Sequence, residues 1–401
     1  MPHGTDKLLL ELLVMFLTAK LLGELFQRIT LPSVLGEILA GILIGPHALN
    51  VIQPDNTIYA FAEIGAIFVL FTAGLETRPR DLIKVGGQAA GVAILGVIAP
   101  FALGFTYMSL HHEPLHESIF VAAAMVATSV GITARVLGDL HALGRREAKI
   151  ILGAAVFDDI LGMVLLAIVI GLASGGIKWV HLSVLFAEAI AFVLFMLLLG
   201  PRIVRGMRPG VSRMSTHNAP LALALALCLF ISWASVRIGM AAIIGAFFAG
   251  LVLADLSPEW NLRPRVFAIH DFLAPFFFFT IGARLDLHVF SSAGVLWAAT
   301  VISLLAIVSK VLGCGLPLIY EGWPTVLRVG IGMMPRGEVA LIVALVGLQL
   351  NVVSESAYGI VIFMTAVTTI LAPPLLRLTM RRRRAERTVL ESEPARVELH
   401  S

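Results

Sequence analysis

The sequence predicts an all-α polytopic membrane protein with about thirteen transmembrane helices, part of which form an inverted repeat containing two broken helices. Hydrophobic residues make up 58% of the 401 residues and charged residues only 14%, and the mean hydropathy is +0.94. Apolar runs of about 18 or more residues recur along almost the whole chain, and each can cross a hydrocarbon layer as a helix. This composition excludes a water-soluble protein, and the length of the runs excludes barrel strands.

Hydropathy, glycine and proline punctuation and charged loops place the spans along the chain. The first apolar run carries Glu11, Lys20 and Glu24, and it lacks a basic leader with a small-residue cleavage site, so we expect a retained helix rather than a signal peptide. Cys228 and Cys314 fall in apolar runs, which indicates buried thiols. We expect spans at 8–27, 32–50, 58–76, 84–109, 117–138, 148–173, 182–203, 218–236, 239–255, 266–284, 291–319, 325–349 and 355–378.

Basic loop residues indicate which way the chain crosses the membrane, because arginine and lysine gather in cytoplasmic loops. If the cluster from Arg381 to Arg384 is cytoplasmic, most other basic loop residues fall on the same side and the N-terminus lies outside. The net charge of +3 is then explained by the basic residues of the cytoplasmic loops. We therefore expect the protein to contact the lipid bilayer and not nucleic acid. The cytoplasmic set is Arg28, Arg78, Arg80, Lys84, Arg145, Arg146, Lys149, Arg202, Arg205, Arg208, Arg213, Arg263 and Arg265, and the external set is Lys7, Lys178, Arg237 and Arg284.

Two spans are interrupted by residues that weaken a helix. The fifth, VAAAMVATSVGITARVL, contains Thr128, Ser129 and Gly131, and the twelfth, GIGMMPRGEVALIVAL, contains Pro335 and Gly337. Non-helical backbone at membrane depth is tolerated where it packs on protein or lines a watery cavity. These spans are an odd number of crossings apart and so run in opposite directions. This predicts an inverted repeat of spans 4–6 and 11–13, with a binding site at the breaks.

A small set of ionisable residues lies deep in the spans of this repeat: Asp158, Asp159, Lys310, Arg336 and Glu338. The two aspartates are the only charged residues of GAAVFDDILGMVLLAIVI. An aspartate at the centre of a spanning helix costs about 2.5 to 3.5 kcal/mol, so the pair needs a partner, a proton or an ion. Neighbouring helix positions point about 100° apart. We therefore expect one aspartate to meet Lys310 and the other to line an ion path.

These residue types suit proton-coupled cation transport. Burial favours a neutral carboxyl group and a nearby cation favours a carboxylate, so proton and metal ion compete for one side chain. A buried lysine can release its proton when the aspartate takes sodium. At the break, the hydroxyl groups of Thr128 and Ser129 and backbone carbonyl groups without helical hydrogen bonds are hard oxygen ligands, which sodium prefers. Two interpretations fit Arg336 and Glu338 equally. They offset the partial charges at the opposed helix ends and take part in coupling, or they form a structural ion pair.

Other polar residues in or near the spans have simpler interpretations. A single acid in a helical bundle commonly makes an interhelical hydrogen bond, and histidines that share one external loop are most simply solvated. We interpret the acids Glu11, Glu24, Glu37, Glu63, Glu76 and Glu188 and the histidines His111, His112 and His116 in this way.

An ordered set of motifs covers essentially the whole chain. It consists of LPSVLGEILAGILIGP at 31–46, FVLFTAGLET at 68–77, VATSVGITARVL at 126–137, GAAVFDDILG at 153–162, IIGAFFAGLVL at 243–253, FLAPFFFFTIGARLD at 272–286, SKVLGCG at 309–315 and GMMPRGEVALIV at 332–343. With this set the sequence resembles the NapA-type bacterial sodium/proton antiporters, within the monovalent cation:proton antiporter superfamily.

The resemblance implies the sodium/proton antiporter fold, in which an inverted repeat brings two broken helices to cross each other. It also implies a homodimer in the bacterial inner membrane, elevator-type alternating access, a role in pH homeostasis and no cofactor. The units it implies are dimerisation-domain helices 1–3 at 1–77, core transport helices 4–6 at 78–175, linker helix 7 at 176–216, dimerisation-domain helices 8–10 at 217–286, core helices 11–13 at 287–380 and a short cytoplasmic tail at 381–401.

The resemblance also assigns roles by position. Asp159 would bind proton and sodium, with Asp158 and Thr128 as further sodium ligands, Asp158 would pair with Lys310, and Thr128 and Ser129 would lie at the crossing. The family's electroneutral branch typically has asparagine in place of the first acid, so the DD form implies electrogenic exchange of cytoplasmic Na⁺ or Li⁺ for external H⁺. Some distant members have an acid where this chain has Ser129, so the details of their ion site do not transfer.

Three alternatives remain at this point. Potassium/proton exchange on the same fold is the first, although the large nucleotide-binding domain of many potassium-efflux relatives is not expected here. An intramembrane aspartyl protease also uses two aspartates, but they must face each other from different helices, and the G-x-G-D signature of that class is missing from the sequence. A passive cation channel can also use broken helices.

Overall fold

The computed structural model describes residues 2–29, 31–173, 179–211, 218–284 and 293–392. Every regular element in these ranges is a helix. The helices are α1 (Pro2–Arg28), α2 (Ser33–Ile44), α3 (Asn56–Leu75), α4 (Pro79–Leu110), α5 (Leu115–Val126), α6 (Val130–Asp139), α7 (Arg146–Ala173), α8 (Trp179–Leu198), α9 (Gly200–Val211), α10 (Ala219–Arg237), α11 (Ala242–Leu253), α12 (Leu262–Ala283), α13 (Ala293–Gly315), the 3₁₀ helix η2 (Leu316–Glu321), α14 (Trp323–Gly332), α15 (Glu338–Gln349) and α16 (Glu355–Ser392).

Each predicted span coincides with one helix or with two consecutive helices. Within the described residues, eight helices are long and apolar enough to cross a membrane, or nine if the bent pair α8 and α9 is one span. Three further apolar helices are shorter, and they lie in α2, α11 and α15. The predicted multi-pass helical fold is confirmed, while the count of thirteen stays a prediction.

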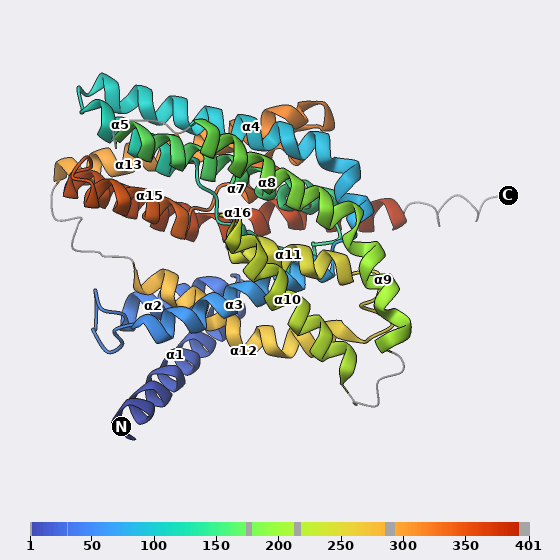
Figure 1. The fold of residues 1–401 in the computed structure, drawn as a ribbon. Coiled ribbons are helices and arrows are strands. Elements are labelled where there is room, and N and C mark those ends of the chain that lie inside the picture. Colours follow the sequence, from blue (N-terminus) through green and yellow to red (C-terminus); the bar gives the residue numbers. More distant parts are fainter. Residues whose placement is uncertain (1, 30, 174–178, 212–217, 285–292, 393–401) are drawn as a thin grey trace.

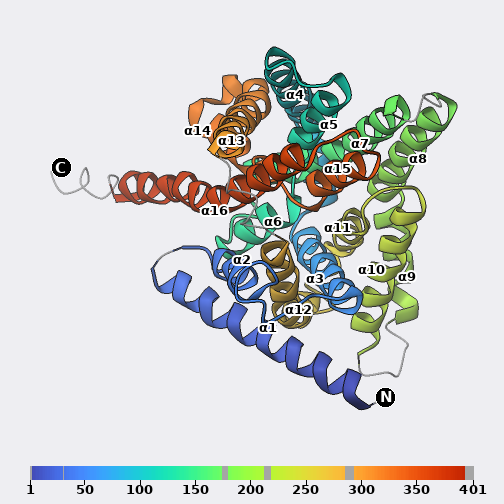
Figure 2. The ribbon, with the colours of Figure 1, turned by 90° about the vertical axis from the view of Figure 1, so that its left-hand side faces the viewer.

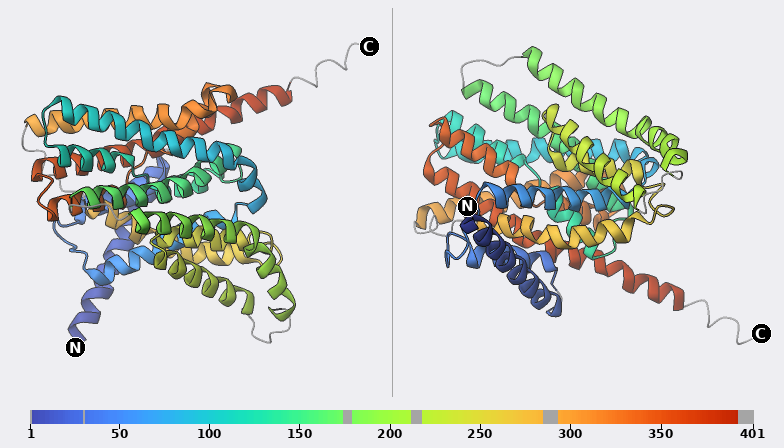
Figure 3. Two further views of the ribbon diagram at one scale, coloured as in Figure 1. Left: turned by 45° about the horizontal axis from the view of Figure 1, so that its top comes forward. Right: turned by 60° about the horizontal axis from the view of Figure 1, so that its bottom comes forward.

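The helices form two bundles (Figures 1 and 2). The first bundle packs α1, α2, α3, α10, α11 and α12 together, and the second packs α4, α5, α7 and α13 to α16 together. Helix α6 follows α5 directly and lies between the two bundles, against α3 and α16. Helix α1 begins at one end of the molecule and α16 projects from the opposite end (Figures 1 and 3).

The first bundle is held by pairs of glycines where its helices cross. A Cβ atom on Gly41 of α2 would collide with the carbonyl oxygen of Phe279 in α12, and a Cβ on Gly282 of α12 would collide with that of Ile38. Glycines in α3 and α11 form a second pair of the same kind. Close backbone approach over small residues is the usual way in which membrane helices pack tightly. Glycines therefore set the close spacing of α2 with α12 and of α3 with α11.

The second bundle repeats one order of elements. A long helix, a broken helix and a second long helix follow each other as α4, α5–α6 and α7, and again as α13, α14–α15 and α16. This is the repeat predicted from the punctuation of spans 4–6 and 11–13. Its two broken members meet in the middle of the bundle, as described below.

The chain between the bundles differs from the expected single span at 182–203. Helix α8 ends at Leu198, and α9 begins at Gly200 with its axis turned by 41° and continues to Val211. The bend has a local cause: Pro201 has no N–H to donate to α8, and a Cβ at Gly200 would lie 2.6 Å from Cγ2 of Val252. The basic stretch expected as a loop is thus partly helical. Lys178, Arg213, the boundary at 286 and 287 and the tail after 392 lie outside the described residues.

Candidate ion-binding site

The two broken helices touch at their breaks. The backbone is non-helical from residue 127 to 129 and from 334 to 337. The Ser129 amide donates to the Pro335 carbonyl at 2.8 Å, and the Thr133 hydroxyl donates to the Gly332 carbonyl at 2.6 Å. The Thr128 hydroxyl lies 3.5 Å from the Met333 carbonyl. Each break thus supplies partners for backbone groups that the other leaves without helical hydrogen bonds.

Arg336 lies inside this crossing and is fully buried. Its Nη1 donates to the Met334 carbonyl at 2.9 Å and contacts the Met333 carbonyl at 3.4 Å, just beyond the end of α14. These carbonyls are at the negative end of the helix dipole, so a cation stabilises them. The predicted charge compensation therefore has a structural counterpart in Arg336. Helix α15 begins at Glu338, whose side chain lies outside the part of the structure that is described.

Asp158 and Lys310 form a buried ion pair. Lys310 Nζ lies 3.0 Å from Asp158 Oδ1, and the two side chains are 0% and 4% exposed. The same ammonium donates to the Gly96 carbonyl at 2.8 Å. A Cβ at Gly96 would lie 2.6 Å from Cys314 Sγ, so glycine lets α4 approach α13 closely enough for this bond. The pair joins α7 to α13, and the lysine joins both to α4.

The ion pair and the crossing are one helical turn apart on α13. Arg336 Nη2 reaches the Ala306 carbonyl at 3.4 Å, and Lys310 follows four positions later. Arg336 is also close enough to Asp158 for an electrostatic interaction. The structure thus brings Asp158, Lys310 and Arg336 together, beside the break that contains Thr128 and Ser129.

Asp159 occupies the next position of α7 and points about 100° away from Asp158. Its side chain is partly exposed, whereas Asp158 is buried. Ser129 is buried and Thr128 is partly exposed. The adjacent acids therefore have different surroundings: Asp158 is buried against a lysine, whereas Asp159 is partly exposed as a residue and keeps one carboxylate oxygen buried.

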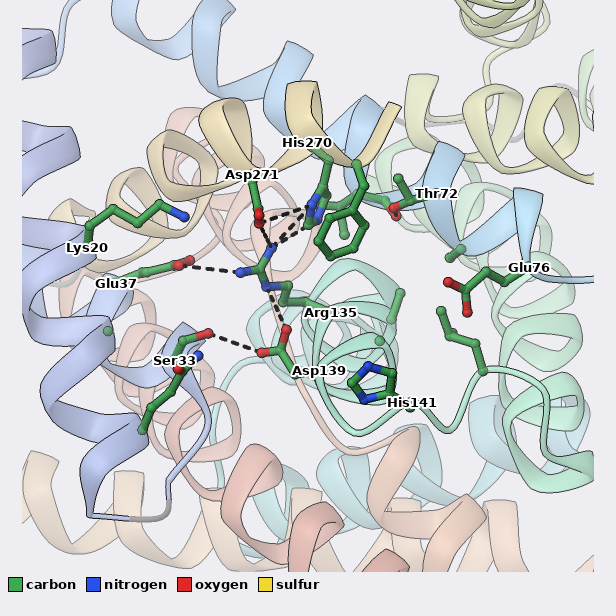
Figure 4. A pocket seen from close by; sticks show the side chains of 18 of the residues that line it. Lys20, Ser33, Glu37, Thr72, Glu76, Arg135, Asp139, His141, His270 and Asp271 are labelled. Carbon is green, nitrogen blue, oxygen red and sulfur yellow. Dashed lines mark hydrogen bonds and ion pairs between the residues drawn. The ribbon is translucent and has the colours of Figure 1, made fainter. Parts of the chain in front are cut away.

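A second group of charged residues, which the sequence analysis did not single out, surrounds Arg135 of α6 (Figure 4). Arg135 contacts Glu37 of α2 and both His270 and Asp271 of α12. These residues line a cavity of about 510 Å³ between the first bundle and α6. The signal in the sequence was an arginine in the apolar half of a broken span, followed by Asp139 four positions later. We refer to Arg135, Glu37, His270 and Asp271 as the Arg135 cluster.

The structure agrees with the prediction of two buried cysteines and with that of an exposed loop of histidines. Cys228 and Cys314 are buried and free. His111, His112 and His116 are exposed. Cys314 packs against Gly96 beside the ion pair, as described above.

Comparisons with known proteins identify the family. Residues 13–382 match the family model for the transmembrane sodium/hydrogen exchanger. The high-affinity Na⁺/H⁺ antiporter NhaS3 of Synechocystis is 35% identical, over 92% of this chain and 89% of its own length. The Na⁺/H⁺-K⁺ antiporter GerN of Bacillus cereus is 30% identical, over 92% of this chain and 95% of its own length.

A solved structure has the same fold. The sodium proton antiporter MjNhaP1 of Methanocaldococcus jannaschii matches with a TM-score of 0.63 and 18% sequence identity, over 92% of this chain and 97% of its own. This match confirms the fold expected from the resemblance. With the family model matching nearly the whole length, the chain belongs to the sodium/hydrogen exchanger family of monovalent cation:proton antiporters.

Proposed function

We propose that this antiporter exchanges Na⁺ or Li⁺ for H⁺ and that Asp159 binds the two ions in alternation. The observation that carries the proposal is the buried pair of Asp158 with Lys310, 3.0 Å apart, next to a second aspartate that points to a different side of α7. Because Lys310 offsets the charge of Asp158, an incoming cation is directed to Asp159. Thr128 and Ser129 supply oxygen ligands at the crossing. Membership of a transporter family removes the hypothesis of an intramembrane protease.

The charges of these residues support electrogenic exchange. With protons bound, Asp159 is neutral, and Lys310 and Asp158 cancel each other. With sodium bound to the Asp159 carboxylate and the Lys310 proton released, Asp158 retains one negative charge. Each cycle then moves two protons against one sodium ion, and one net charge crosses the membrane. One charge moved through 100 mV is worth about 2.3 kcal/mol, so the membrane potential can drive sodium export.

The arrangement of the bundles supports an elevator movement. We propose that residues 78–175 and 287–380, which include the second bundle, carry the site past residues 1–77 and 217–286, with residues 176–216 as the link. The glycine-packed first bundle is suited to stay fixed, and we propose that it forms the homodimer interface. We also propose that the protein lies in the bacterial inner membrane with its N-terminus outside and the projecting end of α16 in the cytoplasm.

Potassium is the second candidate cation. Its support is the 30% identity to GerN, whose name includes potassium. Hydroxyl and carboxylate oxygens bind both alkali ions, so the residues at the crossing do not separate the two.

Proteoliposomes that hold an acidic interior test cation choice and charge movement together. We expect external sodium or lithium chloride to dissipate the pH gradient, with potassium much less effective. In a separate sodium efflux assay, with valinomycin setting the potential, a negative interior should accelerate efflux because net positive charge enters. Protein-free liposomes are the control. Equal rates at 0 and about −100 mV would contradict electrogenic exchange, and cation flux without proton movement would indicate a channel.

A further inference from the structure

The Arg135 cluster joins helix α6 to two helices of the first bundle. Arg135 Nη1 lies 2.9 Å from His270 Nε2. A guanidinium carries only donors, so the histidine nitrogen accepts this hydrogen bond. Nη2 lies 3.6 Å from Glu37 Oε1, and Nη1 lies 3.8 Å from Asp271 Oδ1. One side chain of α6 thus contacts both α2 and α12, as Figure 4 shows.

A second contact one turn further along α6 supports the first. Arg135 Nε lies 3.3 Å from Asp139 Oδ1 on the same helix. The Ser33 hydroxyl of α2 donates to the other oxygen of Asp139 at 3.1 Å. Asp139 therefore orients the guanidinium from one side and is itself held by the first bundle from the other.

Burial raises the cost of losing any of these contacts, and the open space beside them allows them to break. Arg135 is 7% exposed and Glu37 only 1% exposed, so each would be left as a buried, unpaired charge if the other moved away. The cavity of about 510 Å³ beside them is lined by residues of the first bundle, of α6 and of the segment that follows α6. Around the cluster, α6 is therefore joined to the first bundle by polar contacts beside open space. Such contacts are lost within a displacement of a few ångströms, so they can act as a two-state connection.

One turn deeper the same interface is apolar. A Cβ at Gly131 of α6 would lie 3.2 Å from the ring of Phe277 and 3.8 Å from Leu70, both of the first bundle. Non-directional apolar surfaces can slide past each other while they stay in contact. The hydrogen bond to His270 and the buried charge pairing with Glu37 are lost when α6 slides, so the cluster is the part of this interface that resists sliding.

We propose that Arg135 is a positioning residue that holds α6 against the first bundle and so stabilises the conformation seen here relative to the other conformations of the transport cycle. Arg135 does not bind the transported ion. It acts through Glu37, His270 and Asp271, and these contacts must break whenever α6 moves along α2 and α12. The proposal rests on the proposed movement of the two bundles.

Distances between spin labels on the two bundles test this role directly. Suitable label sites are Gly144, which is exposed and has no atom within 4 Å of an added Cβ, and the exposed Arg263 at the start of α12. In the otherwise unchanged protein we expect one dominant distance between the labels. In Arg135→Gln, the ratio of molecules at that distance to molecules at all other distances should fall by at least about threefold. This factor lies toward the lower end of the interaction energies measured between residues in contact. Arg135→Lys, which keeps the charge, should restore part of this ratio.

Two further variants keep the result interpretable. Arg135→Gln combined with Glu37→Gln removes both buried charges, so it should fold even if the single variant does not, and it should show the same redistribution. Arg328→Gln is the matched control, because Arg328 pairs with Glu147 at 3.0 Å, both buried, inside the second bundle. It should leave the distance unchanged. An unchanged distance in the double variant would overturn the proposal.

Transport kinetics separate this role from a general structural one. A shift between conformations should change the sodium concentration for half-maximal rate in opposite directions on the two sides of the membrane. Mere loss of folded protein would lower the maximal rate and leave both concentrations unchanged, and that result would count against the proposal. The label distances do not depend on ion exchange, so they still report on the cluster if the exchange reaction itself proves to be different.

Discussion

Asp159→Asn is expected to abolish coupled exchange. The amide has nearly the size of the carboxylate, but it can neither take up a proton near neutral pH nor offset the charge of a cation. Loss of one charged contact alone costs about 1.5 to 3 kcal/mol, which is roughly a tenfold to hundredfold loss of affinity, and loss of the proton site removes the coupling as well. In proteoliposomes with a pH gradient, added sodium should give the signal of protein-free liposomes.

The control for this variant is Glu63→Gln. Glu63 is an acid on the exposed side of α3, which we interpret as structural. Its replacement should leave the rate close to that of the unchanged protein. Asp159→Asn that folds and still exchanges sodium for protons would show that the ion site lies elsewhere.

Lys310→Met is expected to damage both stability and coupling. It leaves the Asp158 carboxylate buried without its ion pair and removes the donor from the Gly96 carbonyl. Breaking a buried ion pair by removing one partner typically costs about 3 to 5 kcal/mol, so the melting temperature of the purified protein should fall. The ratio of protons to sodium should fall as well, because the lysine no longer contributes a proton.

The double variant Lys310→Met with Asp158→Asn separates these two effects. Removing both charges restores a neutral site, so most of the lost melting temperature should return. The proton ratio should stay low, since the titrating lysine is still missing. A single variant with unchanged melting temperature and unchanged stoichiometry would rule out the role assigned to the pair.

The helices and their breaks could be predicted because both signals are local. Each span is a contiguous apolar run, and Pro335 and Gly337 weaken a helix wherever they occur. The contact between the breaks was expected only from the family resemblance, which implies that the two broken helices cross. The hydrogen bond from Ser129 to Pro335 is part of that contact.

The partners of charged residues were harder to predict, because they depend on contacts between distant parts of the chain. Helix geometry required separate partners for Asp158 and Asp159, but it did not say which of them meets Lys310. Glu37 resembled any other single acid in a span and was interpreted as structural. Only the folded arrangement of α2, α6 and α12 places it beside Arg135.

The bend between α8 and α9 shows a different limit. Gly200 and Pro201 form a recognisable punctuation, but arginines directly after them suggested a loop. The structure instead continues as a helix that carries these arginines, and Arg208 pairs with Glu259 at 2.8 Å. Contacts with the rest of the chain thus decided between helix and loop where the local sequence allowed both.

The most direct test of the central claim, that proton and sodium compete for Asp159, is the dependence of sodium affinity on pH. The sodium concentration for half-maximal rate should be measured in proteoliposomes over several pH values, with the same pH on both sides of the membrane. Competition for one group predicts that this concentration rises as pH falls, by up to about tenfold per unit where a single proton must leave, while the rate at saturating sodium changes much less. A half-maximal concentration that stays constant while the maximal rate changes with pH would show that the two ions bind at separate sites.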